Sequence, residues 1–112
     1  MTDKKVRPKS LPGNTVEVET GCGPMYVTLN SDKDGLFEVF VTMGKAGGCA
    51  ASQIEAIGRL VSLALRSGVQ PYQITKQLSG ICCHSALTKE GEKIASCADA
   101  VAKVIKQHIT IK

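Results

Sequence analysis

Three short apolar stretches, each ended by glycine or by polar turn residues, fill the first half of the chain and constrain its fold most. In residues 15–20 valines alternate with glutamates, the period of two that a half-buried strand shows. Residues 25–30 and 36–43 are rich in β-forming side chains, and the polar turn SDKDG separates them. We therefore expect an antiparallel meander of three strands, with Gly35 at a positive φ in the second turn.

Helical patterns follow this predicted sheet. Apolar residues recur at helical spacing over residues 49–67, and Gly68 stands where a helix commonly ends. Pro71 suits the first turn of a second, shorter helix that reaches about Leu78. The order of elements predicts an α+β domain in which two or three helices cover the meander.

The last third of the chain predicts a loop and one more helix. Residues 81–93 are polar and without periodicity, which indicates a loop. Ser96 with Asp99 three positions later fits a capping box, and apolar residues continue one helical face to about Ile109.

Composition and charge fit one small domain with a basic arm. The chain has 112 residues, of which 43% are hydrophobic, and it carries a net charge of +4. Four cations, Lys4, Lys5, Arg7 and Lys9, crowd the beginning. We divide the chain into a flexible arm and linker, residues 1–13, and a domain, residues 14–112. With no tryptophan and no nucleic-acid motif, DNA or RNA is not an expected partner.

The beginning of the chain lacks the apolar stretch of a secretory signal, and no run reaches membrane-spanning length. We therefore expect a cytoplasmic protein without a membrane partner. Thiols stay reduced in the cytoplasm, so five cysteines indicate metal or redox chemistry more than a disulfide framework.

Four of the five cysteines fall at the ends of predicted elements. Cys22 follows the first strand, Cys49 opens the first helix, Cys83 begins the predicted loop and Cys97 lies in the first turn of the last helix. Four thiolates suit tetrahedral zinc or, alternatively, an iron–sulfur cluster. No CxxC pair is present, and free cysteines are often simply buried, so the residues alone leave an inert core open.

A glycine-rich loop, GKAGG, precedes the first predicted helix. Backbone N–H groups of Gly47 and Gly48, with the charge of Lys45, would suit the phosphate of a nucleotide. The loop lacks the Walker pattern, and a turn from strand to helix uses glycines in any case. Phosphate binding and a purely structural turn both remain open.

Taken together, these residues resemble the TSCPD domain, which occurs at the C-terminal end of adenosylcobalamin-dependent (class II) ribonucleotide reductases and as short free-standing proteins. The matching blocks are TGCGPMYVTLN (20–30), FEVFVTMGKAGGCAASQIEAIGRLVSLALRSGV (37–69), KQLSGICC (76–83) and SCADAVAKVI (96–105). The name-giving stretch departs from the family at Ala98, where a proline is usual. Cys82 and His84 likewise replace the arginine and proline that commonly flank the third cysteine.

The resemblance implies that Cys22, Cys49, Cys83 and Cys97 share one metal, and it favours Cys83 over Cys82 as the third ligand. It also implies a non-catalytic accessory or regulatory module of the reductase, because the catalytic barrel with its cobalamin site needs several hundred residues more. One alternative is a free-standing protein that sequesters a nucleotide or nucleotide-derived signal through GKAGG. Another is a thiol relay through Cys82 and Cys83. An open sheet edge makes a homo-oligomer a further expectation.

Overall fold

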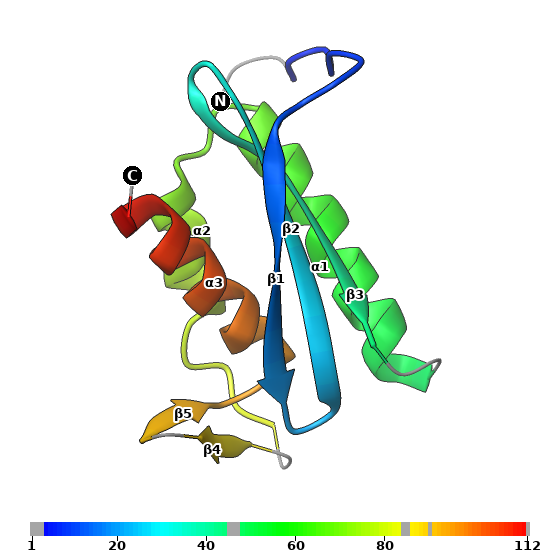
Figure 1. Ribbon diagram of the computed structural model, residues 1–112, viewed down its shortest axis with the longest axis vertical. Coiled ribbons are helices and arrows are strands. Elements are labelled where there is room, and N and C mark those ends of the chain that lie inside the picture. The colour runs from blue at the N-terminus through cyan, green and yellow to red at the C-terminus, as the bar shows by residue number, and fades with distance from the viewer. Residues whose placement is uncertain (1–3, 45–47, 84–85, 90, 112) are drawn as a thin grey trace.

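The computed structural model describes residues 4–44, 48–83, 86–89 and 91–111. Along the chain the elements are β1 (Gly13–Thr20), β2 (Gly23–Asp32), β3 (Gly35–Met43), α1 (Gly48–Arg66), α2 (Pro71–Leu78), β4 (Leu87–Lys89), β5 (Glu92–Ile94) and α3 (Cys97–Ile111). Among these residues no helix combines the length and apolar character that crossing a membrane requires. The predicted α+β class, a three-stranded meander followed by helices, is confirmed (Figure 1).

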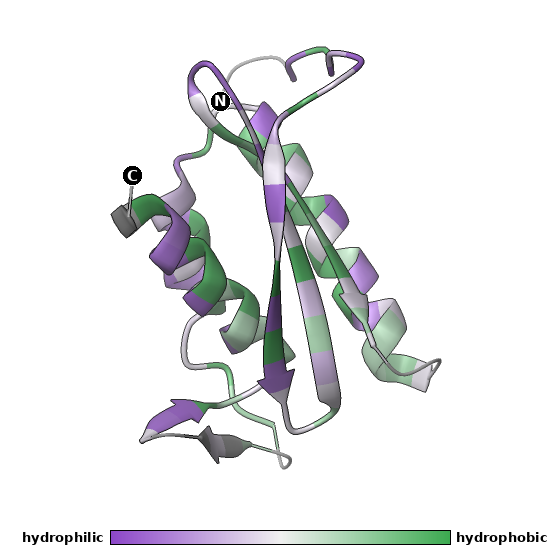
Figure 2. Cartoon of the chain, viewed as in Figure 1, coloured by the Kyte–Doolittle hydropathy of each residue, from purple (hydrophilic) through white to green (hydrophobic). Residues whose placement is uncertain are grey.

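The first three strands form one antiparallel sheet in the order β1-β2-β3. Its register pairs Val16 with Val27 and Val27 with Val41, so the valines of all three strands lie on one face. Gly35 has a φ of 128°, which confirms the predicted turn between β2 and β3. Apolar and polar positions alternate along β1, as Figure 2 shows.

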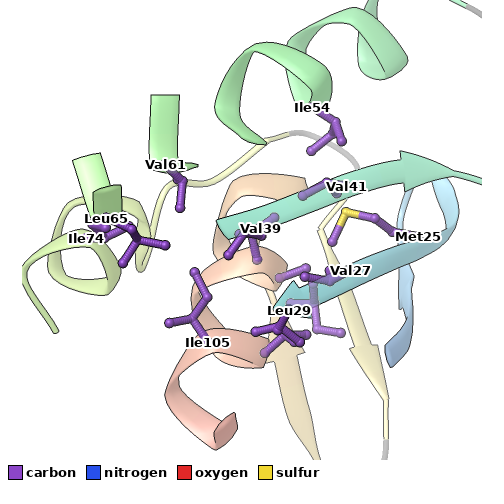
Figure 3. Close-up of a cluster of buried hydrophobic side chains, with 14 residues drawn as sticks. Met25, Val27, Leu29, Val39, Val41, Ile54, Val61, Leu65, Ile74 and Ile105 are labelled. Atoms are coloured by element: carbon purple, nitrogen blue, oxygen red, sulfur yellow. The ribbon is translucent and has the colours of Figure 1, made fainter. Parts of the chain in front are cut away.

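The core lies between the valine face of the sheet and the three helices (Figure 3). Its members are Met25, Val27, Leu29, Val39, Val41, Ile54, Val61, Leu65, Ile74, Ile94, Ala100, Val101, Val104 and Ile105. Ile105 of α3 is fully buried in this cluster. On the opposite face of the sheet Tyr26 and Phe40 remain partly exposed, which is the alternation that a two-layer domain requires.

Helix α1 packs along the outer edge of β3 through small side chains. The Ser62 hydroxyl donates to the carbonyl oxygen of Val39 at 2.9 Å and accepts the N–H of the same residue at 3.0 Å. Gly58, one turn earlier, brings the helix close enough that a Cβ would lie 3.4 Å from the Val39 oxygen. The edge of β3 is thereby occupied by the helix at this point.

The described part of the basic arm contacts the opposite end of the sheet from the β1–β2 turn. Nε and an Nη of Arg7 donate to the two carboxylate oxygens of Glu38 at 2.9 and 2.8 Å. Asn30 donates to the same carboxylate at 2.8 Å, and Glu38 is only 2% exposed. Lys5 pairs with Asp32 and Asp34. The predicted boundary near residue 13 stays a prediction.

A small hairpin occupies the stretch that we predicted to be a loop, and that prediction was wrong. Strands β4 and β5 pair antiparallel, with Thr88 opposite Lys93 and Lys89 opposite Glu92. Each has three residues, which is too short for an alternation of apolar and polar positions to be detected in the sequence.

Candidate metal centre

Four element ends lie toward one end of the molecule's long axis: the β1–β2 turn, the start of α1, the connection from α2 to β4, and the start of α3 (Figure 1). Each carries one of the predicted ligands, Cys22, Cys49, Cys83 and Cys97 in that order. All are free thiols, of which Cys97 is partly buried and the other three are exposed.

The hydroxyl of Thr20 connects two of these cysteines. It accepts the backbone N–H of Cys22 at 3.1 Å and the thiol of Cys97 at 3.7 Å. It donates to the carbonyl oxygen of Gly23 at 2.8 Å, and Thr20 itself is buried. The β1–β2 turn is thereby tied to the first residue of α3.

The Cys97 thiol is influenced electrostatically by two other cysteines. Burial raises the pKa of the Cys97 thiol, the hydrogen bond with Thr20 opposes this, and the nearby Cys22 and Cys83 raise the pKa further. Cys22 and Cys83 therefore each lie near Cys97, although Cys22 stands 75 residues before Cys97, by subtraction of their numbers.

The carboxylate of Asp99 holds the segment that carries Cys83. One oxygen accepts the N–H of Gly80 at 2.9 Å and the other accepts the N–H of Ala95 at 3.0 Å. Cys83 in turn donates its N–H to the Ala95 carbonyl at 2.9 Å. Both ends of the excursion from α2 to α3 are thus attached to the first turn of α3, beside Cys97.

Burial by itself raises the pKa of Asp99, but the N–H groups of Gly80 and Ala95 and the cation of Lys103 outweigh it and leave a lowered pKa. The carboxylate is therefore charged at neutral pH. Ser96 accepts the N–H of Asp99 at 3.1 Å, which confirms the predicted cap of this helix.

The fourth predicted ligand, Cys49, is the second residue of α1 and is exposed. Across the described ranges, no three histidine, cysteine, aspartate or glutamate side chains are placed to hold a metal ion as they stand. The clustering of Cys22, Cys83 and Cys97 nevertheless fits the sulfur donors that zinc and iron–sulfur clusters take. The four-cysteine site stays a prediction.

Two other sequence predictions are also left open. In the GKAGG loop, Lys45 and Gly47 lie outside the described residues, and Gly48 opens α1 with a φ of 80°. Cys82 is exposed beside Cys83, and His84 lies outside the described residues. Neither phosphate binding nor a thiol relay is tested by these positions.

Sequence reading missed Thr20 and saw Asp99 only as a helix-capping residue. Thr20 ends a strand, where threonine is common, so nothing in the sequence distinguishes it. Asp99 does carry a usable signal, since an acidic residue three positions after Ser96 predicts a carboxylate that bonds backbone N–H groups at the start of the helix. Its hydrogen bond with Gly80 forms only because the fold brings the end of α2 to the start of α3, and no local sequence pattern indicates that contact.

Comparison with known proteins adds a family. The family model described as TSCPD domain matches residues 1–109. A vitamin B12-dependent ribonucleotide reductase of Streptantibioticus cattleyicolor is 40% identical over 67 residues, which are 59% of this chain and 11% of that protein. Enzymes of the same name from Streptomyces clavuligerus and Streptomyces coelicolor match at 40% over 67 residues, with 7% of each covered. No solved structure matches.

Proposed function

The chain belongs to the TSCPD domain family, and on that premise we propose that it is a metal-binding, non-catalytic accessory module of a vitamin B12-dependent ribonucleotide reductase. The chain spans between 7 and 11% of the length of the curated relatives it matches. The activity named for those relatives therefore belongs to proteins of which this chain resembles one small part.

The observation that supports a metal is the proximity of Cys22 and Cys83 to Cys97 at the start of α3, where the Thr20 hydroxyl accepts hydrogen bonds from both Cys22 and Cys97. Three separate segments bring them there, and Thr20 and Asp99 fix the backbone on either side. Such a site would stabilise the fold of a chain that has no disulfides, because the free energy of metal binding adds directly to the free energy of folding.

The metal that fits best is zinc, with an iron–sulfur cluster as the alternative. Cys22, Cys83 and Cys97 would hold it, and Cys49 at the start of α1 would complete four sulfur ligands. Bound there, zinc would act as a structural cross-link and carry out no reaction. The residues of this chain would hold the thiolates in place and join the β1–β2 turn to α1 and α3.

The test is native mass spectrometry of the full chain, purified with no added metal, before and after a chelator. We expect one zinc per chain, and a melting temperature that falls when the metal is removed. Cys97→Ser should lose the zinc, whereas Cys82→Ser, which changes an exposed neighbour outside the proposed set, should keep it. The proposal would be contradicted if the chain is purified without metal and its melting temperature changes neither when zinc is added nor when a chelator is added.

Association with a reductase needs its own test. We expect the purified chain to bind a vitamin B12-dependent ribonucleotide reductase from the same genome in sedimentation-velocity experiments, and to show no nucleotide reduction by itself. Failure of the two purified proteins to co-sediment at micromolar concentration would remove the reductase as partner and leave the metal proposal standing.

A further inference from the structure

The outer face of α1 exposes large apolar side chains away from the cysteine end. Leu60 is 67% exposed and Leu63 is 49% exposed, and both lie in the C-terminal half of the 19-residue helix. They form a ridge with a groove on each side. We call this ridge and its two grooves the α1 face.

The first groove runs between α1 and β3 and has a volume of about 500 Å³. Leu63 and the half-exposed Phe40 contribute apolar surface to it. Lys4, Arg59 and Arg66 also line it. Arg66 is held in place, since it donates to the Lys5 carbonyl at 3.0 Å and lies 5.2 Å from the centre of the Phe37 ring.

The second groove runs between α1 and α2 and has a volume of about 590 Å³. Leu60 forms one wall and Tyr72, which is 59% exposed, contributes from α2. Lys76 is the charged residue among those that line it.

The charged residues of the α1 face are mostly cations. Four cations line the two grooves, namely Lys4, Arg59, Arg66 and Lys76. The carboxylate among the lining residues is Glu55, and it is paired with Arg59 at 2.6 Å. Apolar surface framed by cations complements apolar surface framed by carboxylates.

We propose that the α1 face docks an acidic amphipathic helix of a partner protein. Apolar side chains of that helix would enter the grooves on either side of Leu60 and Leu63, as in other helix-in-groove complexes. Its carboxylates would meet Arg66 and Lys76. The positive charge of the face thus favours an acidic partner, and the grooves favour a partner with projecting apolar side chains.

Two other occupants fit the face less well. A second copy of the chain would bring the same excess of cations to the contact, at a cost in electrostatic repulsion. An anionic membrane would satisfy the charges, but a flat lipid surface fills a ridge with two grooves poorly.

The experiment is an NMR titration of the ¹⁵N-labelled full chain with a synthetic acidic peptide. The peptide is an amphipathic helix with Leu at i, i+3, i+4 and i+7 and Glu elsewhere, and its partner peptide has every Glu replaced by Lys. We expect amide shifts in α1 and α2 with the acidic peptide only, weakening as salt is raised.

Variants then assign the contact. Leu63→Gln should weaken binding about tenfold or more, as loss of a central apolar anchor does. Val6→Gln makes the same kind of change at a side chain that is 90% exposed in the arm, and should leave binding unchanged. Both positions are exposed, so neither variant should unfold the chain.

Four results would overturn the proposal. They are no shifts at millimolar acidic peptide, equal shifts with the basic peptide, concentration-dependent shifts of α1 in the chain alone, and shifts of α1 produced by anionic vesicles but not by peptide. The third would assign the face to a second copy and the fourth to a membrane. None of them bears on zinc content, so the metal proposal is judged separately.

Discussion

At the scale of single residues, the Thr20 hydroxyl uses its whole hydrogen-bonding capacity at the cysteine end. It donates once, to Gly23, and accepts twice, from Cys22 and Cys97. A hydroxyl so employed in a buried position is costly to delete, because its partners lose both the bond and access to water.

Thr20→Val keeps the shape of the side chain and removes these bonds. We expect the free energy of unfolding to fall by about 1–3 kcal/mol, measured by urea denaturation. Thr15→Val is the matched control, since the Thr15 hydroxyl bonds Thr28 on the exposed face of the same sheet. An equal loss of unfolding free energy in the two variants would show that the buried hydrogen bonds of Thr20 stabilise the fold no more than the exposed bond of Thr15 does.

The contact of Arg7 with Glu38 makes stability depend on pH. Burial raises the pKa of Glu38, but hydrogen bonds from Arg7 and Asn30 and the charges of Arg7 and Arg66 outweigh it and leave a lowered pKa. A lowered pKa stabilises the fold at pH values above the unfolded carboxyl's pKa, about 4.3. That stabilisation is lost as the pH falls through the folded value.

Arg7→Gln should therefore move acid unfolding to higher pH, because burial of Glu38 would then be opposed by Asn30 and Arg66 alone. The measurement is circular dichroism during titration from neutral to acidic pH. In a Glu38→Gln background the same Arg7 change should leave the midpoint where it is. A shift that persists in that background would mean that Arg7 acts through something other than Glu38.

At the scale of elements, the sequence predicts those strands, turns and helix ends whose signal lies within a few neighbouring residues. The valines and glutamates of β1, the turn at Gly35 and the start of α2 at Pro71 all carry their signal within a few residues, and each is confirmed. The β4–β5 hairpin carries no such signal and was missed. Its strands have three residues each, and the contact beside them, from Asp99 of α3 to the N–H of Ala95 just after β5, comes from a different element.

The candidate site follows the same division. That cysteines would stand at element ends was predictable, because strand and helix limits have local signals. That Cys22, Cys83 and Cys97 would become neighbours depends on where α3 packs, which is a matter of tertiary contacts. Cys49 shows the limit of this reasoning, since its place at a helix start does not by itself bring it to the others.

The Ser62 side chain of α1 forms hydrogen bonds with the backbone N–H and carbonyl groups of Val39 at the edge of β3. Ser62→Ala would leave both polar groups of Val39 without that partner, and we expect a loss of about 1–3 kcal/mol in the free energy of unfolding. Ser52→Ala is the control on the same helix, because the Ser52 hydroxyl bonds only an exposed carbonyl of the first turn. Equal losses would mean that α1 does not depend on this contact with β3.

At the scale of the whole molecule, one core serves all the layers. Ile105 of α3 is fully buried among residues of the sheet and the other helices. Ile105→Ala should cost about 2–5 kcal/mol, as large-to-small changes in a packed core do. The transition should stay cooperative, with circular dichroism and tyrosine fluorescence reporting the same midpoint. Separate midpoints would show that α3 melts apart from the sheet.

The bonds from Asp99 to Gly80 and Ala95 close the base of the segment between them. A stretch that leaves and rejoins the body at one side chain can gain or lose residues at its tip without moving α2 or α3. We therefore expect the tip of the β4–β5 hairpin to be the place where this scaffold accepts inserted residues without a change in the elements beneath it.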